Sequence, residues 1–165
     1  MVEGDITDQQ VDAVVNAANR RMRGGGGVDG AIHGAAGPDL YDECVQRFPH
    51  GLATGSAGWT SGHLLPARWV IHVVGPNYTA GETDRSLLVS CYVNALAVAD
   101  EIGALTVAFP LVSAGIYGWP RSDAIAAAVD TLRSTPTHVE ESRIVAFGRT
   151  AYEEIVSYSG NAAGE

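Results

Sequence analysis

A carboxylate and an imidazole stand four residues apart, directly after a run of four glycines at 24–27. They are Asp29 and His33 in the segment GGGGVDGAIH. Side chains at i and i+4 share one face of a helix, so these two would meet if the segment is helical. On that face they could position a water molecule or a sugar hydroxyl for reaction. The residues alone leave an alternative, in which Asp29 caps the helix and His33 is simply packed.

The glycine run itself indicates an anion site. Four consecutive glycines are costly to order, because each loses much conformational freedom. The cost is understandable if the backbone must approach a ligand closely or curl its amides around an anion. The run leads into a predicted helix, whose free N–H groups and dipole favour a phosphate. An ordinary flexible loop is the alternative.

A second glycine-bearing loop, SAGIYG at 113–118, follows a predicted strand at 106–110. Its small residues would let successive amides point at a pyrophosphate, while Ile116 and Tyr117 could cover the ligand. The chain has no GxxxxGK[ST] motif and no lysine, which argues against hydrolysis of nucleoside triphosphates. The alternative is an ordinary connection between a strand and a helix.

The segment GDIT at 4–7 has the groups needed to read adenine. The Asp5 carboxylate could accept from the adenine amino group, and the Ile6 amide could donate to the neighbouring ring nitrogen. Taken alone, the tetrapeptide is better explained by Asp5 or Thr7 capping a turn.

Strand and helix patterns alternate along the chain and would position these loops. Apolar runs rich in β-branched residues predict strands at 11–16, 69–74, 106–110 and 143–147, with an edge strand at 56–60 and a stub at 1–4. Helical spacing predicts helices at 28–36, 38–48, 83–102, 120–132 and 150–159. This alternation is typical of a mostly parallel sheet in a three-layer α/β sandwich, where ligands bind beyond the carboxyl ends of the strands.

Length and composition fit one domain, predicted at 1–159, with a disordered tail at 160–165. The 165 residues are 46% hydrophobic, enough for one core. A net charge of −9 makes a nucleic-acid partner unlikely, because such a surface repels phosphate backbones. It still allows a small anion held by backbone amides. The abundant alanine and the use of arginine as the sole basic residue suggest a GC-rich bacterial genome.

The two cysteines and five histidines suggest neither disulfide nor metal chemistry. Cys44 and Cys91 belong to apolar helical patterns, so we expect reduced, buried thiols in a cytoplasmic protein without a signal peptide. The histidines form no ligand cluster with cysteine. No apolar run approaches the roughly 20 residues that span a bilayer. We therefore expect a monomer that needs no metal or cofactor and has no membrane partner.

The sequence resembles the macrodomain family, and its MacroD branch most closely. The matching segments are GDIT at 4–7, VDAVVNAAN at 11–19, GGGGVDGAIHGAAG at 24–37, LPARWVIHVVGP at 65–76, FPLVSAGIYGWP at 109–120 and the strand that ends in Phe147. Their order and spacing fit from Gly4 to about Tyr158. The resemblance implies an α/β/α sandwich around a mixed, mostly parallel six-stranded sheet with a cleft for ADP-ribose.

The resemblance also implies a role for each matching residue. Asp5 and the Ile6 amide would read adenine, and Phe147 would stack on the adenine ring. Asn19 would bind the distal ribose, with Asp29 beside that ribose and a catalytic water, and His33 supporting Asp29. The diphosphate would be clasped by Gly25, Gly26, Gly27 and Val28 on one side and by Ser113, Ala114, Gly115, Ile116 and Tyr117 on the other, with Tyr117 also shaping the distal-ribose pocket.

The implied activity is removal of mono-ADP-ribose from Asp or Glu side chains of modified proteins, together with deacetylation of O-acetyl-ADP-ribose. Either Asp29 or a ligand phosphate would activate the water, and the sequence leaves both routes open. The alternatives are a reader that binds ADP-ribose without turnover and a hydrolase acting on ADP-ribosylated nucleic acid. Two features depart from the family pattern: the first strand is short or missing, and Ser56 replaces an acidic residue common among relatives.

Overall fold

Six strands form one mixed sheet in the order β1-β6-β5-β2-β4-β3. The computed structural model describes residues 1–163, and every strand pairing in that part of the chain is parallel except β3 with β4. The strands are β1 (Val2–Glu3), β2 (Ala13–Ala18), β3 (Ala57–Ser61), β4 (Trp69–Val74), β5 (Thr106–Phe109) and β6 (Glu141–Ala146). The predicted mixed, mostly parallel sheet with a shortened first strand is confirmed.

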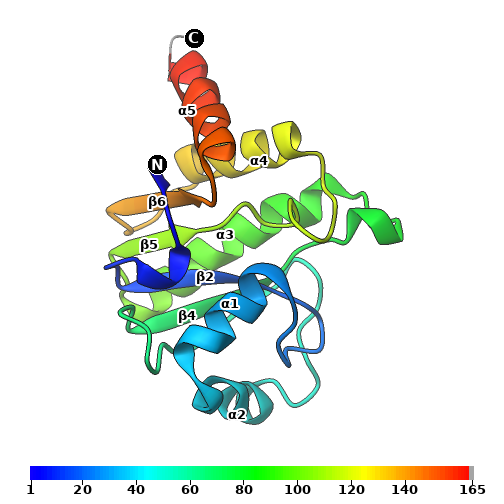
Figure 1. The fold of residues 1–165 in the computed structure, drawn as a ribbon, viewed down its shortest axis with the longest axis vertical. Coiled ribbons are helices and arrows are strands. Elements are labelled where there is room, and N and C mark those ends of the chain that lie inside the picture. Colours follow the sequence, from blue (N-terminus) through cyan, green and yellow to red (C-terminus); the bar gives the residue numbers. More distant parts are fainter. Residues whose placement is uncertain (164–165) are drawn as a thin grey trace.

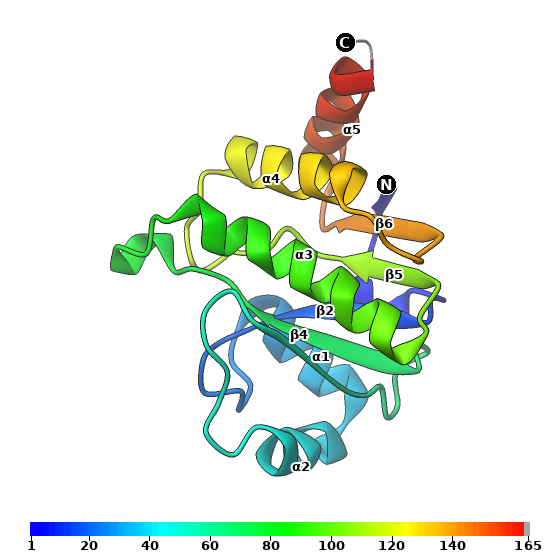
Figure 2. The ribbon, with the colours of Figure 1, turned by 180° about the vertical axis from the view of Figure 1, so that it is seen from behind.

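Helices cover both faces of this sheet and give the predicted three layers (Figures 1 and 2). Helices α1 (Gly27–Ala36) and α2 (Pro38–Arg47) lie on one face, with the short 3-10 turn η1 (Ile6–Asp8). Helices α3 (Arg85–Ile102) and α4 (Arg121–Ser134) lie on the other, joined by α5 (Arg149–Ala163) near β6. A second 3-10 turn, η2 (Tyr78–Ala80), follows β4.

Alternating side chains along the central strands divide the core between the two faces. In β2, Val14 packs toward α1 and α2, whereas Ala13 and Val15 pack toward α3 and α4. The same alternation places Val70 on the first face and Ile71 on the second. Both faces are apolar because both are covered by helices, which is the usual pattern of a parallel sheet.

Most predicted elements are present, with small shifts at their ends. The β4 prediction is exact in its bounds, whereas β2 runs to Ala18, two residues past the predicted end. Helix α3 begins at Arg85 because the Asp84 carboxylate caps it, accepting a hydrogen bond of 3.0 Å from the Ser86 amide. The predicted disordered tail is wrong for residues 160–163, which continue α5. The remaining residues of that tail, 164–165, lie outside the described part.

The parallel strands all point their carboxyl ends to one edge of the sheet, and the two glycine loops leave from that edge. The chain leaves β2 after Ala18 toward the glycine run, and it leaves β5 after Phe109 toward the SAGIYG loop. Among the helices of residues 1–163, none is both long and apolar enough to cross a membrane.

The hydroxyl of Tyr92 on α3 anchors the start of the SAGIYG loop. The Val112 amide donates to it at 3.0 Å, and the hydroxyl donates to the Pro110 carbonyl at 3.4 Å. All three residues are buried, so these backbone groups have no access to water as a substitute partner.

We expect Tyr92→Phe to lower the free energy of unfolding by about 1–2 kcal/mol, because it strands a buried amide and a buried carbonyl. Urea unfolding followed by circular dichroism measures the change. The control is Tyr41→Phe, which alters an exposed ring on α2 and should leave the midpoint where it is. Equal midpoints for the two variants would mean that the Tyr92 hydroxyl does not hold the loop.

Candidate functional site

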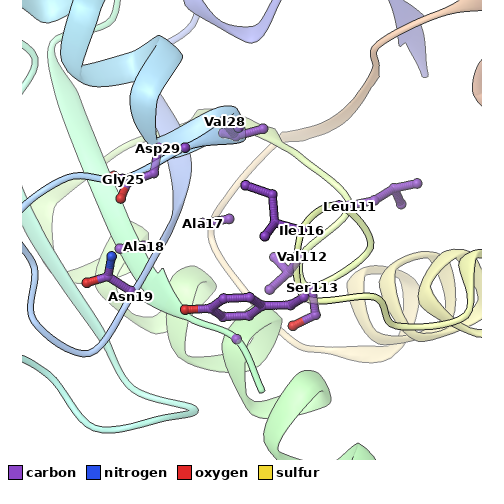
Figure 3. A pocket seen from close by; sticks show the side chains of 15 residues that line it. Ala17, Ala18, Asn19, Gly25, Val28, Asp29, Leu111, Val112, Ser113 and Ile116 are labelled. Atoms are coloured by element: carbon purple, nitrogen blue, oxygen red, sulfur yellow. The ribbon is translucent and has the colours of Figure 1, made fainter. Parts of the chain in front are cut away.

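A cavity of about 200 Å³ opens at the carboxyl edge of the sheet, between the two glycine loops. Figure 3 shows Asn19, Gly25 and Asp29 on one side of it and Val112, Ser113 and Ile116 on the other. The lining residues are Ala17, Ala18, Asn19, Gly25, Gly26, Gly27, Val28, Asp29, Gly75, Leu111, Val112, Ser113, Gly115, Ile116 and Tyr117. The two glycine loops are far apart in the sequence, yet they enclose one space.

Most of the residues predicted for the site line this cavity. They are Asn19, Gly25, Gly26, Gly27, Val28, Asp29, Ser113, Gly115, Ile116 and Tyr117. The predicted residues outside its lining are His33, Asp5, Ile6, Ala114 and Phe147. Lining residues that sequence reasoning did not include are Ala17, Ala18, Gly75, Leu111 and Val112. These five residues are small or apolar and lie at the carboxyl ends of three adjacent strands. That combination could have indicated them in the sequence.

The glycine loop allows the backbone to pass close to its neighbours. A Cβ added to Gly26 would lie 3.0 Å from Ile116 Cδ1, so the two loops nearly touch. One added to Gly30 would lie 2.6 Å from the Gly25 carbonyl oxygen. Helix α1 begins here with Gly26 as its N-cap and no side chain capping it, so its first amides face the loop without a side-chain acceptor. This arrangement suits an anion.

Asp29 presents a nearly buried carboxylate, 4% exposed, at the inner end of the cavity. Its Oδ1 accepts a hydrogen bond of 2.8 Å from Asn16 Nδ2 and lies 3.4 Å from His33 Nε2. Burial raises the pKa of Asp29, and the Asn16 hydrogen bond and the His33 ring oppose that rise. The predicted meeting of Asp29 and His33 on one helix face is confirmed. His33 lines a neighbouring cavity with Arg23 and Tyr41.

Asn19 holds the glycine loop against the end of β2. Its Nδ2 donates to the Gly24 carbonyl at 3.1 Å, and its Oδ1 accepts from the Arg21 amide at 3.1 Å. A Cβ added to Gly25 would lie 3.2 Å from both Asn19 Nδ2 and Asp29 Oδ2. Asn19 and Asp29 therefore flank the same glycine, and the second N–H of the Asn19 amide is available to a ligand.

The opposite wall contains a strained serine. Ser113 has a φ of +65°, a region that side chains rarely adopt, and its buried Oγ has no hydrogen-bond partner among the described residues. Gly75 permits this geometry, since a Cβ there would collide with Ser113 Oγ and would lie 2.7 Å from Val112 Cγ1. Burial raises the pKa of Tyr117, which keeps its phenol neutral. The orphaned hydroxyl fits a ligand oxygen.

The predicted adenine residues lie together at the end of β6. The Gly4 amide donates to the Ala146 carbonyl at 2.9 Å, which places Asp5 near Phe147. Asp5 Oδ1 accepts from the Thr7 amide at 2.9 Å and from the Thr7 hydroxyl at 2.6 Å, so the capping interpretation of this segment holds. Ile6 is buried, whereas the Phe147 side chain is 89% exposed and packs against little.

Two buried polar side chains beside the cavity were not singled out from the sequence. Asn16 and His72 lie in the otherwise apolar runs VVNAA and VIHVV. A polar residue inside an apolar strand pattern could have indicated both of them. No group of three or more His, Cys, Asp or Glu side chains in residues 1–163 is placed to hold a metal ion. The chemistry on offer is that of carboxylate, amide, imidazole and backbone N–H groups.

A mixed six-stranded sheet with a cleft between two glycine-bearing loops is the architecture of a macrodomain. Residues 15–128 match the Macro domain, and the chain belongs to this family. It is 51% identical over 166 residues to a Macro domain-containing protein of Streptomyces nogalater, covering 98% of this chain and 92% of the relative. A second such protein, from Streptomyces coelicolor, is 51% identical over 164 residues, with 97% of each covered.

Solved structures agree with this membership. A macrodomain variant of Oceanobacillus iheyensis, solved with ADPR, superposes with a TM-score of 0.93 at 35% identity, covering 99% of this chain and 92% of that one. The Trypanosoma brucei macrodomain in complex with ADP-ribose gives a TM-score of 0.86 at 38% identity, covering 95% and 67%. The fold of the present chain is therefore that of a macrodomain over its described length.

We expect Gly75→Ala to lower the free energy of unfolding by about 1–3 kcal/mol, because the new methyl group displaces Ser113 and Val112. Chemical denaturation measures this, and hydrogen exchange of the 113–117 amides should accelerate. Gly115→Ala is the matched control, since no atom lies within 4 Å of a Cβ there. If Gly75→Ala were as stable as the control, the close contact between β4 and the loop would not matter.

Proposed function

We propose that this chain binds ADP-ribose in the cavity and hydrolyses its ester to acidic side chains of modified proteins. The observation that carries the proposal is the pairing of Asp29 and Asn19 at one end of a cavity whose walls include the N-terminus of α1, which no side chain caps, and the Ser113 hydroxyl, which has no partner among the described residues. The relatives solved with ADPR or ADP-ribose support the choice of ligand.

The diphosphate would lie between the two loops. The N-terminus of α1 supplies amides and a favourable dipole on one side, and residues 113–117 supply the hydroxyl and amides on the other. The distal ribose would then reach Asn19 and Asp29. The adenine would extend toward Asp5 and the Ile6 amide, with the exposed Phe147 ring against its face.

The reaction is the hydrolysis of an ester at the distal ribose. Water adds a hydroxyl to one side of the broken bond and a proton to the other, giving ADP-ribose and the free Asp or Glu carboxylate. In one route Asp29 takes the proton from the water, and its raised pKa makes it a better base. In the other a ligand phosphate takes the proton and Asp29 orients the ribose. O-acetyl-ADP-ribose carries an ester at the same sugar, so its deacetylation follows from the same site.

The segments GGGGVDGAIH and SAGIYG favour the MacroD branch, whose members are hydrolases. A reader that binds without turnover needs the cavity but not the Asp29 carboxylate. The presence of this carboxylate, nearly buried at 4% exposure, therefore favours catalysis. The formal charge of −9 favours a protein substrate over ADP-ribosylated nucleic acid.

We expect Asp29→Ala to reduce release of ADP-ribose by at least about 100-fold, because both routes need this carboxylate. The assay is chromatographic detection of free ADP-ribose from a protein modified on glutamate. Asp39→Ala is the control, since it removes an exposed carboxylate from the first turn of α2. Binding of ADP-ribose by the wild type without any release would identify a reader instead.

We expect Phe147→Ala to weaken ADP-ribose binding by about 1–3 kcal/mol, the usual scale of stacking between a base and an aromatic ring. Isothermal titration calorimetry measures the affinity. Leu105→Ala is the control, because Leu105 is also exposed, at 43%, but precedes β5 at the opposite edge of the sheet. An affinity equal to that of the control would place the adenine elsewhere.

A further inference from the structure

A row of three buried polar side chains crosses the sheet beneath α1, starting at Asp29. Asn16 comes from β2, His72 from β4 and Thr60 from β3, and they are 0%, 1% and 0% exposed. Asn16 pairs directly with His72 in the strand register, and Thr60 lies two residues from the residue opposite His72. Their alternate neighbours are apolar, so the row is a polar line through a hydrophobic layer.

Hydrogen bonds link the row from end to end. Asn16 Nδ2 lies 2.8 Å from Asp29 Oδ1 and 3.1 Å from His72 Nδ1. His72 Nε2 lies 2.9 Å from Thr60 Oγ1 and 4.0 Å from Cys44 Sγ. An amide nitrogen carries two hydrogens, so both are used here, one on the carboxylate and one on the imidazole.

This pattern assigns the proton on His72. Because Nδ1 accepts from Asn16, the ring must carry its proton on Nε2 and donate it to the Thr60 hydroxyl. Complete burial lowers the pKa of His72 to about 3, so the ring is neutral at physiological pH. Phe48 packs edge-on against the ring, with centroids 6.0 Å apart, and helps keep water away.

The reverse arrangement of donors and acceptors along the row does not fit an ionised Asp29. If His72 carried its proton on Nδ1, the Asn16 amide would turn its oxygen toward the ring and therefore toward Asp29. Two oxygens would then face each other unless Asp29 were protonated. An ionised Asp29 accepts only, so it selects the Asn16 orientation, which makes His72 Nδ1 an acceptor and leaves the Nε2 proton to be donated to the Thr60 hydroxyl.

The row also has a cost that packing alone does not offset. Asn16 Oδ1 is buried without a hydrogen-bond partner among the described residues, a condition that destabilises the fold. An apolar residue would avoid this cost in a strand whose buried neighbours are Val15 and Ala18. What Asn16 adds is a directed contact to the carboxylate.

Both positioning contacts fall on the same oxygen of Asp29. Asn16 and His33 approach Oδ1, whereas Oδ2 lies beside Gly25, which lines the cavity. Fixing one oxygen leaves the other free and aimed at the space beside Gly25. A side chain held at one oxygen in this way needs little reorganisation to contact a substrate.

We propose that Asn16, His72 and Thr60 are positioning residues that fix the orientation of the Asp29 carboxylate for reaction at the distal ribose. The proposal rests on the hydrolase function proposed above. None of the three lines the cavity, so the row acts through Asp29 rather than on the ligand.

The test compares two substitutions at the far end of the row. Thr60→Val keeps the shape of the side chain and removes its hydroxyl, whereas Thr60→Ser keeps the hydroxyl and removes a methyl group. We expect Thr60→Val to lower kcat for ADP-ribose release by about tenfold with KM unchanged, the size of effect seen when a supporting hydrogen bond is lost. Thr60→Ser should stay within about twofold of the wild type. A larger loss in Thr60→Ser would show that packing matters and the hydroxyl does not, which overturns the proposal.

A second measurement needs neither a variant nor activity. Nitrogen-15 NMR of the wild-type imidazoles reports which nitrogen of His72 bears the proton. We expect the Nε2–H tautomer with no titration between about pH 5 and 8. The Nδ1–H tautomer, or a protonation step in that interval, would sink the proposal.

The two hypotheses fail in different ways. If the wild type binds ADP-ribose but releases none, the hydrolase function fails, and the row is then judged by the carboxyl carbon-13 shift of Asp29. Its titration midpoint should rise in Thr60→Val and not in Thr60→Ser, because only the first leaves the His72 Nε2–H without the hydroxyl that accepts it, which disfavours the arrangement suited to an ionised Asp29. Equal midpoints in the two variants would reject the positioning role whether or not the chain is a hydrolase.

Discussion

The site depends on how closely separate backbone segments approach one another at the carboxyl edge of the sheet. Gly26 and Ile116 bring the two loops to within van der Waals contact, and Gly75 makes room for the Ser113 side chain. A methyl group at Gly75 would collide with Ser113 and Val112, and one at Gly26 would crowd the Ile116 side chain. The residues that line the cavity include no basic side chain, and the N-terminus of α1 offers backbone amides there. That explains how a chain with a net charge of −9 can still present a cavity suited to an anion.

The sequence predicts local features well because they depend on local geometry. The bounds of β4, the short β1 and the contact between Asp29 and His33 all follow from patterns within a few residues. It does not predict the neighbour relation of Asn16 and His72, which depends on β4 lying next to β2 in the sheet. That adjacency is a property of the strand order, which the spacing of residues along the sequence does not determine.

The end of the chain shows a second limit of sequence reasoning. The position of residues 160–163 near the chain terminus favours disorder, yet they continue α5, whose Ile155 is buried against the core. A helix already packed at its middle can extend through weak helix formers such as Gly160 and Asn161, because nucleation has been accomplished elsewhere. Position near a terminus is therefore a poor guide to disorder when the preceding turns of the helix are anchored.

The inner end of the cavity and the segment proposed to bind adenine are built differently, and the difference suits catalysis by the proposed route. At the inner end, Asp29 is held by hydrogen bonds that continue across three strands of the sheet. Asp5 and Phe147, which are proposed to bind the adenine, lie outside the cavity lining, where Asp5 is held by a local turn and Phe147 stands in solvent. Binding energy gathered at an adaptable adenine segment would be used to place the ribose against a rigid inner end, which raises the rate only if the carboxylate does not move. The buried row is what would keep it still.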